Sequence, residues 1–230
     1  MKKHGKKFIE AAKKIEKEKL YPLSEAIKLA LQTSVVKFDA TVEVHVNTNT
    51  NPKYADQIIR SSIILPHGTG KSVKVAAFCD DSQEEIAKKA GADFVGSDEL
   101  IEKVLKGKVN FDIAVAQPSL MKNLGKIAKI LGPKGLMPSL KSGTVTNELE
   151  KIITEIKKGK IEFKNDKSGI VHTILGKVSF GDKKITENFN AFKEALIQAK
   201  PSGNKGGYLK KITITTSMGP GINIDLKDII

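Results

Sequence analysis

The chain has 230 residues, 40% of them hydrophobic, which is enough for one large or two ordinary domains and excludes a wholly disordered protein. Its 39 lysines and arginines exceed its 26 acidic residues, and the net charge of +13 favours a polyanionic partner, nucleic acid rather than an anionic membrane. No uncharged stretch approaches the roughly 20 apolar residues of a membrane span, and no signal-peptide core follows the basic N-terminus, so we expect a cytoplasmic protein without a membrane partner.

Two helices are predicted before the first strand. The first covers residues 1 to 19, where apolar residues recur at helical spacing among eight lysines. Its charged face is either simply solvated or a secondary contact for RNA phosphates, and the pattern leaves both open. The second helix runs from Ser24, its expected cap, to about Gln32.

A strongly alternating strand follows. Its apolar face is expected to hold Phe38, Ala40, Val42, Val44 and Val46, and its other face Thr41, Glu43 and His45. Glu43 has two interpretations. It is either an exposed strand residue paired with a lysine, or an acceptor for a base amino group or a 2′-hydroxyl in a nucleic-acid site.

The next segment predicts a short helix and then a crossing between domains. Asn51 and Pro52 are typical of a helix start, with Ala55, Ile58 and Ile59 turned inward. A proline and two glycines then indicate a flexible crossing rather than a packed element. The predicted hinge residues are Leu65, Pro66, His67, Gly68, Thr69 and Gly70, with Gly159 in the returning crossing.

Residues 68 to 159 alternate strand and helix in the manner of an α/β domain with a mainly parallel sheet. The predicted strands are Val73 to Cys79, Phe94 to Val95 and Asp112 to Ala116. The predicted helices begin at the capping residues Ser82, Ser97, Ser119 and Asn147.

Beyond Lys160 the period of two returns, at residues 161–163, 169–180 and 212–216, with one amphipathic helix through Ile185 and Leu196. We therefore predict a two-domain α/β protein. Residues 1–67 and 160–230 form a discontinuous α+β domain, into which residues 68–159 are inserted as a three-layer, Rossmann-like α/β domain.

The two predicted domains differ in charge. The insert holds 15 lysines against 12 acidic residues, a net charge of +3. The rest of the chain holds 24 basic and 14 acidic residues, a net charge of +10. A nucleic-acid surface is expected on the discontinuous domain.

Two glycine-containing loops have alternative interpretations. Gly68 to Ser72 ends like a phosphate-binding P-loop, but Leu65 stands where that signature requires glycine, and the segment precedes a strand instead of following one. A nucleotide-dependent enzyme using the α/β domain is the alternative function. The loop Gly132 to Pro138 either ends a helix, with Lys134 suited to the helix dipole, or contacts phosphate.

The residue types of catalysis and metal binding form no recognisable arrangement. Cys79 is alone and ends an apolar run, so we expect a small buried side chain. The four histidines, at positions 4, 45, 67 and 172, lack metal-ligand spacing. No enzyme activity, metal or cofactor is predicted. With aromatic residues at 5% and no tryptophan, recognition dominated by base stacking is disfavoured.

Near the C-terminus, a strand through Thr213 and Thr215 breaks at Gly219-Pro220-Gly221. The break is either an ordinary hairpin loop or a contact surface in which amides and hydroxyls are held rigidly. Together with Leu65 to Lys71 and Leu131 to Pro138, the segment Ser217 to Gly221 resembles the ribosomal protein L1 family, and the resemblance extends from Lys6 to Asp225. Two departures are Ser217, where that family usually has threonine, and Ser139-Leu140, where it usually has Asn-Pro.

The resemblance implies an RNA-binding surface on the discontinuous domain. Its residues would be Phe38, Thr41, Glu43, Lys167, Gly169, His172, Lys177, Ser179, Thr216, Ser217, Met218, Gly219, Pro220 and Gly221. The implied function is that of a structural constituent of the large ribosomal subunit, a monomer when free, that binds ribosomal RNA at the L1 stalk. It also implies help in releasing deacylated tRNA from the exit site, and repression of the protein's own operon by binding its mRNA.

Overall fold

A computed structural model describes residues 5–16, 18–107, 109–140, 142–204 and 206–229, and the chain divides into two compact units. The first unit comprises Met1–Gly70 and Glu162–Ile230, and the second comprises Lys71–Ile161. The expected boundaries, after residues 67 and 159, lie slightly before these. The predicted N-terminal helix is α1 (Lys6–Lys13), and the parts of that prediction at residues 1–4 and 17 lie outside the described residues.

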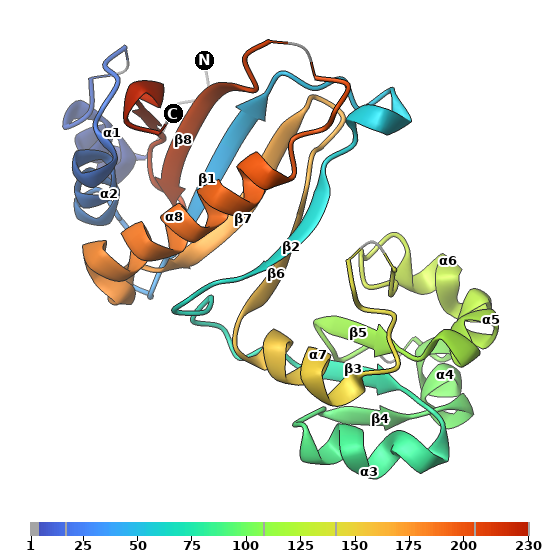
Figure 1. Cartoon of the computed structure of the whole chain (residues 1–230). Coiled ribbons are helices and arrows are strands. Elements are labelled where there is room, and N and C mark those ends of the chain that lie inside the picture. The colour runs from blue at the N-terminus through green and yellow to red at the C-terminus, as the bar shows by residue number, and fades with distance from the viewer. Residues whose placement is uncertain (1–4, 17, 108, 141, 205, 230) are drawn as a thin grey trace. The chain divides into compact units, whose positions relative to one another are not determined.

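The first unit holds a four-stranded antiparallel sheet in the order β7-β1-β8-β9 (Figure 1). The strands are β1 (Thr41–Thr48), β7 (Ile170–Lys177), β8 (Leu209–Thr216) and β9 (Ile222–Ile224). In β1 the buried and half-buried residues alternate along the whole strand, as expected for a sheet with one covered face. The β9 strand was not predicted, because the Gly-Pro-Gly break was read as the end of pairing.

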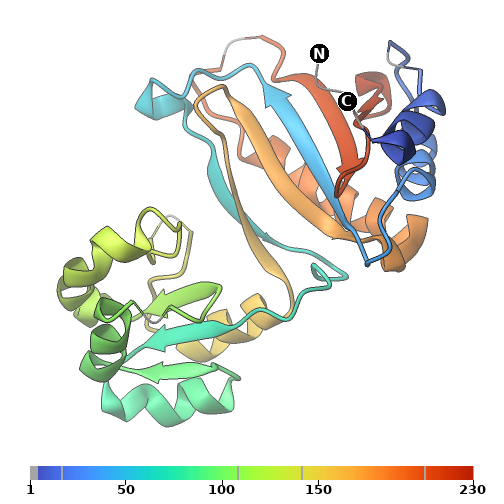
Figure 2. The same ribbon diagram turned by 180° about the vertical axis from the view of Figure 1, so that it is seen from behind.

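Two helices cover one face of this sheet. They are α2 (Leu23–Gln32) and α8 (Gly181–Gln198), and their inner residues join Val42, Val44 and Val46 in one hydrophobic core. The predicted inner residues of the long helix, from Ile185 to Leu196, are all buried. Figure 2 shows the other face of the sheet in front, with α8 behind it. Phe38 was placed on the buried face, but it precedes the strand and is 60% exposed.

A second, two-stranded sheet pairs β2 (Arg60–Ile64) with β6 (Lys160–Lys164), the strand in which the chain passes from the second unit back to the first. Arg60 and Glu162 form an ion pair across this sheet. The helix predicted after Asn51 is wrong, because only one 3₁₀ turn forms, at Ala55–Gln57. The side chain of Asn165 holds the backbone there, accepting a hydrogen bond from the Ile59 amide (3.0 Å) and donating one to the Gln57 carbonyl (3.2 Å). A helix would need those backbone groups.

The segment from Leu65 to Gly68 was expected to be an unpacked crossing, and this is wrong. Leu65 is buried, and the fully buried Asn188 of α8 holds the segment by two hydrogen bonds. Its Oδ1 accepts from the His67 amide at 3.0 Å, and its Nδ2 donates to the Gly68 carbonyl at 3.1 Å. A proline and glycines make a segment irregular, but irregular backbone can still be fixed by a buried amide side chain.

The second unit contains a parallel sheet in the order β4-β3-β5, formed by β3 (Val75–Phe78), β4 (Phe94–Gly96) and β5 (Ile113–Ala116). All four residues of β3 are buried. The helices α3 (Asp81–Lys89) and α7 (Leu149–Lys157) share one hydrophobic cluster with the sheet. A second cluster joins it to α4 (Asp98–Leu105), α5 (Met121–Leu124) and α6 (Ala128–Leu131). The mixed α/β character that was predicted is confirmed.

Helix ends were predicted less well than helix interiors. The N-cap residues of α2, α3, α4 and α7 are Pro22, Asp80, Ser97 and Glu148, respectively. Of these only Ser97 was predicted, and its side chain makes no capping hydrogen bond. The helix expected from Ser119 is divided by the 3₁₀ turns Pro118–Leu120 and Gly125–Ile127. Its apolar residues at helical spacing, Leu120, Leu124, Ile127 and Leu131, are nevertheless all buried, because 3₁₀ and α turns place nearly the same residues inward.

Candidate nucleic-acid interface

The sheet face that carries no helix presents polar side chains in cross-strand rows. Thr41 of β1 lies opposite Lys177 of β7, and Glu43 lies opposite Ile174 of β7 and Thr215 of β8. His45 lies between His172 and Thr213 in the next row. A strand directs alternate side chains to opposite faces, so the burial of Val42 and Val44 against the helices fixes these residues on the outer face.

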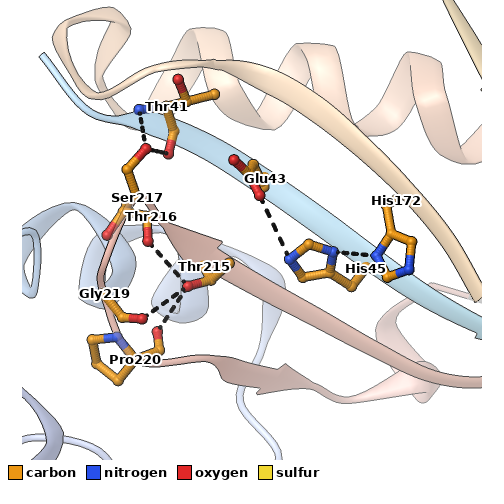
Figure 3. Close-up of polar contacts among 9 residues, drawn as sticks. All are labelled: Thr41, Glu43, His45, His172, Thr215, Thr216, Ser217, Gly219 and Pro220. Carbon is orange, nitrogen blue, oxygen red and sulfur yellow. Dashed lines mark hydrogen bonds and ion pairs between the residues drawn. The ribbon is translucent and has the colours of Figure 1, made fainter. Parts of the chain in front are cut away.

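Backbone groups of Thr41 bond Ser217 in the turn after β8, and Figure 3 shows the contacts that the Ser217 hydroxyl makes with the Thr41 amide and carbonyl. The Thr41 amide donates to the Ser217 hydroxyl at 3.1 Å, and the Ser217 amide donates to the Thr41 carbonyl at 3.0 Å. The Thr41 hydroxyl also accepts from the Lys177 ammonium at 3.0 Å. Residues that lie far apart in the sequence are thereby fixed side by side at one end of the sheet.

The turn from Thr216 to Gly219 has a strained backbone at its tip. Met218 has φ of 61° and is the only non-glycine residue with positive φ in the described part of the chain. A left-handed conformation costs a residue with a Cβ about 1–2 kcal/mol. The turn is closed by a 2.7 Å hydrogen bond from the Gly219 amide to the Thr216 carbonyl. A Cβ on Gly219 would lie 2.3 Å from the Thr216 hydroxyl oxygen, so only glycine fits there.

Met218 is 74% exposed at the tip of this turn. The Thr215 hydroxyl donates toward the carbonyls of Gly219 (3.2 Å) and Pro220 (3.4 Å) and so holds the residues that follow the tip, as Figure 3 shows. An exposed apolar side chain on a rigid, hydrogen-bonded turn is typical of an interface anchor.

A second hydrogen-bonded group lies beside Thr41. Asp39 accepts hydrogen bonds from the Ser179 amide (3.0 Å) and the Ser179 hydroxyl (2.7 Å). These bonds, and the charge of Lys177, hold the pKa of the Asp39 carboxyl below its ordinary value. The carboxylate thus positions Ser179 and the start of β1.

Two histidines lie next to Glu43 on the same face. The Nδ1 atoms of His45 and His172 are 2.8 Å apart, and the His45 Nε2 lies 3.8 Å from a Glu43 carboxylate oxygen (Figure 3). Burial lowers the pKa of His45, and the positive charge of His172 lowers it further, while Glu43 opposes both effects. The Glu43 carboxylate therefore lies next to a histidine, and no lysine among the described residues forms an ion pair with it, although pairing with a lysine was one of its two interpretations.

Comparison with known proteins identifies the family of this chain. A family model described as "Ribosomal protein L1p/L10e family" matches residues 30–220. The chain belongs to the ribosomal protein L1 family. Relatives named "Large ribosomal subunit protein uL1" include one from Solidesulfovibrio magneticus, 51% identical over 100% of this chain and 97% of that protein. Another, from Lactobacillus delbrueckii subsp. bulgaricus, is 50% identical over 98% of this chain and 97% of its own length. A third, from Lactobacillus acidophilus, is 48% identical over 98% of both chains.

These names describe a ribosomal protein and not an enzyme, which agrees with the prediction that the L1-family chain has no catalytic activity. The P-loop alternative also lacks structural support. Lys71 precedes β3 and forms an ion pair with Asp112 at 2.6 Å, whereas a P-loop lysine must follow a strand and open a helix. Within the described residues no cluster of three potential metal ligands occurs, and no helix is both long and apolar enough to cross a membrane.

Most residues expected to bind RNA gather at the end of the sheet near Thr41. Accessible side chains or backbone there belong to Phe38, Thr41, Lys177, Ser179, Ser217, Met218, Gly219 and Gly221. Thr216 and Pro220 are buried, so they shape the turn and present no side chain. Glu43 and His172 lie further along the same face.

Lys167 and Gly169 lie at the other end of the sheet, in the turn before β7. Gly169 is buried, its carbonyl accepts hydrogen bonds from the amide and hydroxyl of Thr48, and a Cβ there would lie 2.6 Å from the Thr50 carbonyl oxygen. This glycine is therefore needed for packing, and its contact with RNA stays a prediction. Lys167 is exposed but separated from Met218 by most of the length of β1, about 20 Å at 3.3 Å per residue.

Asp39, His45 and Thr215 belong to this surface but were not predicted as part of it. For His45, the alternation of β1 had already indicated the outer face. Asp39 and Thr215 gave no such signal, because their role is to hold other loops through hydrogen bonds that depend on the strand register.

In the second unit, Cys79 is buried as predicted, and burial raises the pKa of its thiol to about 11. The loop after α6 ends that helix through a hydrogen bond from the Leu136 amide to the Leu131 carbonyl (3.0 Å), which favours the helix-termination alternative.

Proposed function

We propose that the outer face of the β7-β1-β8 sheet, together with the Thr216–Gly221 turn, binds large-subunit ribosomal RNA at the L1 stalk. The single observation that carries the proposal is the turn tip. A non-glycine residue is held in a strained, left-handed conformation with its side chain 74% exposed. Such strain contributes nothing to folding and is retained where a partner uses the side chain.

The groups around the turn suit RNA better than a generic polyanion. The hydroxyls of Thr41 and Ser217 and the carboxylate of Glu43 can pair with 2′-hydroxyls and base amino groups, which distinguish RNA from DNA. Lys177 supplies the positive charge for a phosphate, and its ammonium is already oriented by the Thr41 hydroxyl at 3.0 Å. These side chains are short or fixed by hydrogen bonds, so ordering them costs little entropy.

The finer functions implied by the family are part of the same proposal. As a constituent of the large subunit in the cytoplasmic ribosome, the protein would assist release of deacylated tRNA from the exit site. It would also repress its own operon by binding a similar element in the mRNA. The free protein would be a monomer in which the α/β unit is an inserted, Rossmann-like domain. The hinge would bend after the anchored segment Leu65–Gly68, near Gly70, and in the returning chain near Gly159.

The proposal is tested by removing one hydroxyl from the surface. Thr41→Val deletes the group that positions Lys177 and is expected to weaken binding to a transcript of the stalk region by about 1–3 kcal/mol. Thr154→Val is the matched control, because the Thr154 hydroxyl also makes one hydrogen bond, to the Glu150 carbonyl, but lies in the second unit. Equal losses in the two variants, measured by filter binding at fixed salt, would place the site elsewhere.

A further inference from the structure

His45 and His172 form a close pair on the outer face of the sheet. They are direct cross-strand neighbours, their ring centroids are 4.9 Å apart with an edge-on arrangement, and their Nδ1 atoms approach to 2.8 Å. This separation is a hydrogen-bond distance between two nitrogens, so one Nδ1 carries a hydrogen and the other accepts it.

The remaining nitrogens of the pair both face carboxylates. The Nε2 of His45 lies 3.8 Å from Glu43, and the Nε2 of His172 lies 3.6 Å from Asp166. Next to a carboxylate, a ring nitrogen that carries a hydrogen is attracted, while one that presents a lone pair is repelled.

Counting hydrogens gives the charge of the pair. One hydrogen between the Nδ1 atoms and one on each Nε2 make three, whereas two neutral imidazoles carry two. A fourth hydrogen would bring two N–H groups into opposition at 2.8 Å. The state with three hydrogens, which carries one positive charge in total, directs a hydrogen toward each carboxylate, whereas burial, which lowers the pKa of His45, favours the uncharged state with two hydrogens in the free chain.

The charged neighbours of the pair come from each element beside it. Glu43 on β1 and Asp166 in the turn before β7 both favour the protonated state. On β8 the opposite residue is the uncharged Thr213, with Lys211 one row further along. The side chains of His45 and His172 remain 29% and 50% exposed, so a ligand can approach them directly.

We propose that His45 and His172 together form one protonated RNA contact, and that the pair takes up its shared proton as an RNA phosphate binds. The inference rests on the proposed RNA-binding function of this face. A phosphate stabilises the positive charge, and binding therefore shifts the pair toward its protonated state. Conversely, a lower pH strengthens binding.

The sign of this linkage follows from proton counting. The RNA complex holds more protons than the free components, so affinity rises as pH falls through the histidine range around 6.5 and levels off once the free pair is protonated. For one linked proton the slope cannot exceed tenfold per pH unit. We expect binding about three- to tenfold tighter at pH 6 than at pH 8.

The test is isothermal titration calorimetry of the full chain with a transcript of the stalk region of large-subunit ribosomal RNA, in buffers of different ionisation enthalpy. The buffer dependence of the heat gives the number of protons taken up per complex. The wild-type chain is expected to take up between about 0.2 and 1 proton near pH 7. His45→Gln and His172→Gln, which keep a hydrogen-bonding side chain without a titratable ring, are expected to lose this uptake.

His67→Gln is the matched control. His67 is also paired with a carboxylate, that of Glu187, but it lies outside the sheet face, so its removal should leave the proton uptake unchanged. Uptake that persists in His45→Gln, or that disappears in His67→Gln, overturns the inference.

A measurement without RNA separates this inference from the proposed function. Nitrogen NMR of the histidine rings in the free chain is expected to show His45 and His172 titrating as a coupled pair. Two rings that titrate independently overturn the shared proton even if RNA binds. If the wild-type chain fails to bind the transcript at any pH, the proposed function is wrong, and the RNA-linked uptake is wrong with it.

Discussion

The central strands of the two units differ in what they leave exposed. In β1 of the first unit, buried residues alternate with half-buried ones, whereas all four residues of β3 in the second unit are buried. Helices cover one face of the first sheet, and hydrophobic clusters with helices lie on both faces of the second. A parallel sheet connected by helices is covered on both sides as a consequence of its topology, while an antiparallel sheet can leave one face to solvent.

This difference decides where a large, flat partner can bind. The uncovered sheet face gives the first unit a rigid array of side chains from three neighbouring strands, in which every position is fixed by hydrogen-bonded backbone. The second unit has no uncovered sheet face, so it can offer a partner only loops and helix surfaces.

Separating the units should give the largest effect. Replacing residues 71–159 with a short Gly/Ser linker keeps β2 and β6 whole and is expected to leave RNA affinity within about tenfold of the intact chain. The excised fragment 71–161 should bind at least about 1,000-fold more weakly, because it contributes none of the proposed contacts. Both are measured by RNA titration, with circular dichroism to confirm folding. A folded remnant that loses more than about 3 kcal/mol of binding would show that the second unit carries part of the site.

The sequence could predict this division because the spacing of apolar residues along a strand shows how many of its faces are buried. Alternation at Val42, Val44 and Val46 indicates one covered face, and the unbroken apolar run from Val75 to Phe78 indicates two. The strand β2 could not be predicted in this way, because none of its residues is buried in the narrow β2-β6 ribbon. Periodicity reports only how much of an element is covered.

Polar tethers between distant segments could not be predicted. Asn165 and Asn188 fix backbone more than 100 residues away, and neither has a local pattern that identifies its partner. The proximity of His45 and His172 likewise depends on the register of β1 and β7, which shifts at an irregularity between Val42 and Glu43. The family resemblance supplied most of the candidate surface, but it also included Gly169, whose role is packing.

The dependence on salt should be the second largest effect. If the first unit contacts about five phosphates, log affinity should fall with log salt at a slope of about −3.5 to −4.5, a loss of more than a hundredfold between 50 and 200 mM salt. The remnant without residues 71–159 should give the same slope, since each lost phosphate contact would reduce it by about 0.7 to 0.9. Titrations of both proteins over this range check the prediction. A clearly shallower slope for the remnant would assign phosphate contacts to the second unit.

Met218→Gly should separate the stability of the first unit from its binding. Glycine relieves the left-handed strain at φ of 61°, so the free energy of unfolding should rise by up to about 1 kcal/mol. RNA binding should nevertheless weaken by about 1–3 kcal/mol, because the exposed thioether side chain is lost. Urea unfolding and RNA titration measure the two quantities. Met121→Ala is a control for general loss of a methionine, since Met121 belongs to the second unit. Unchanged RNA affinity in Met218→Gly would remove the turn tip from the interface.

The smallest effect is expected at Cys79 in the second unit, whose rate of alkylation should hardly change when RNA binds. Its thiol is buried and has a pKa raised to about 11, so at pH 8 roughly one molecule in a thousand carries the reactive thiolate, and alkylation requires the surrounding core to open. The rate of alkylation by iodoacetamide therefore reports local opening of the second unit. If RNA contacts only the first unit, saturating RNA should alter this rate by less than about twofold. Urea-unfolded chain, in which the thiol is exposed, gives the reference rate. A slowing of about tenfold or more by RNA would correspond to about 1.4 kcal/mol of stabilisation of the second unit. That result would show that RNA binding involves both units.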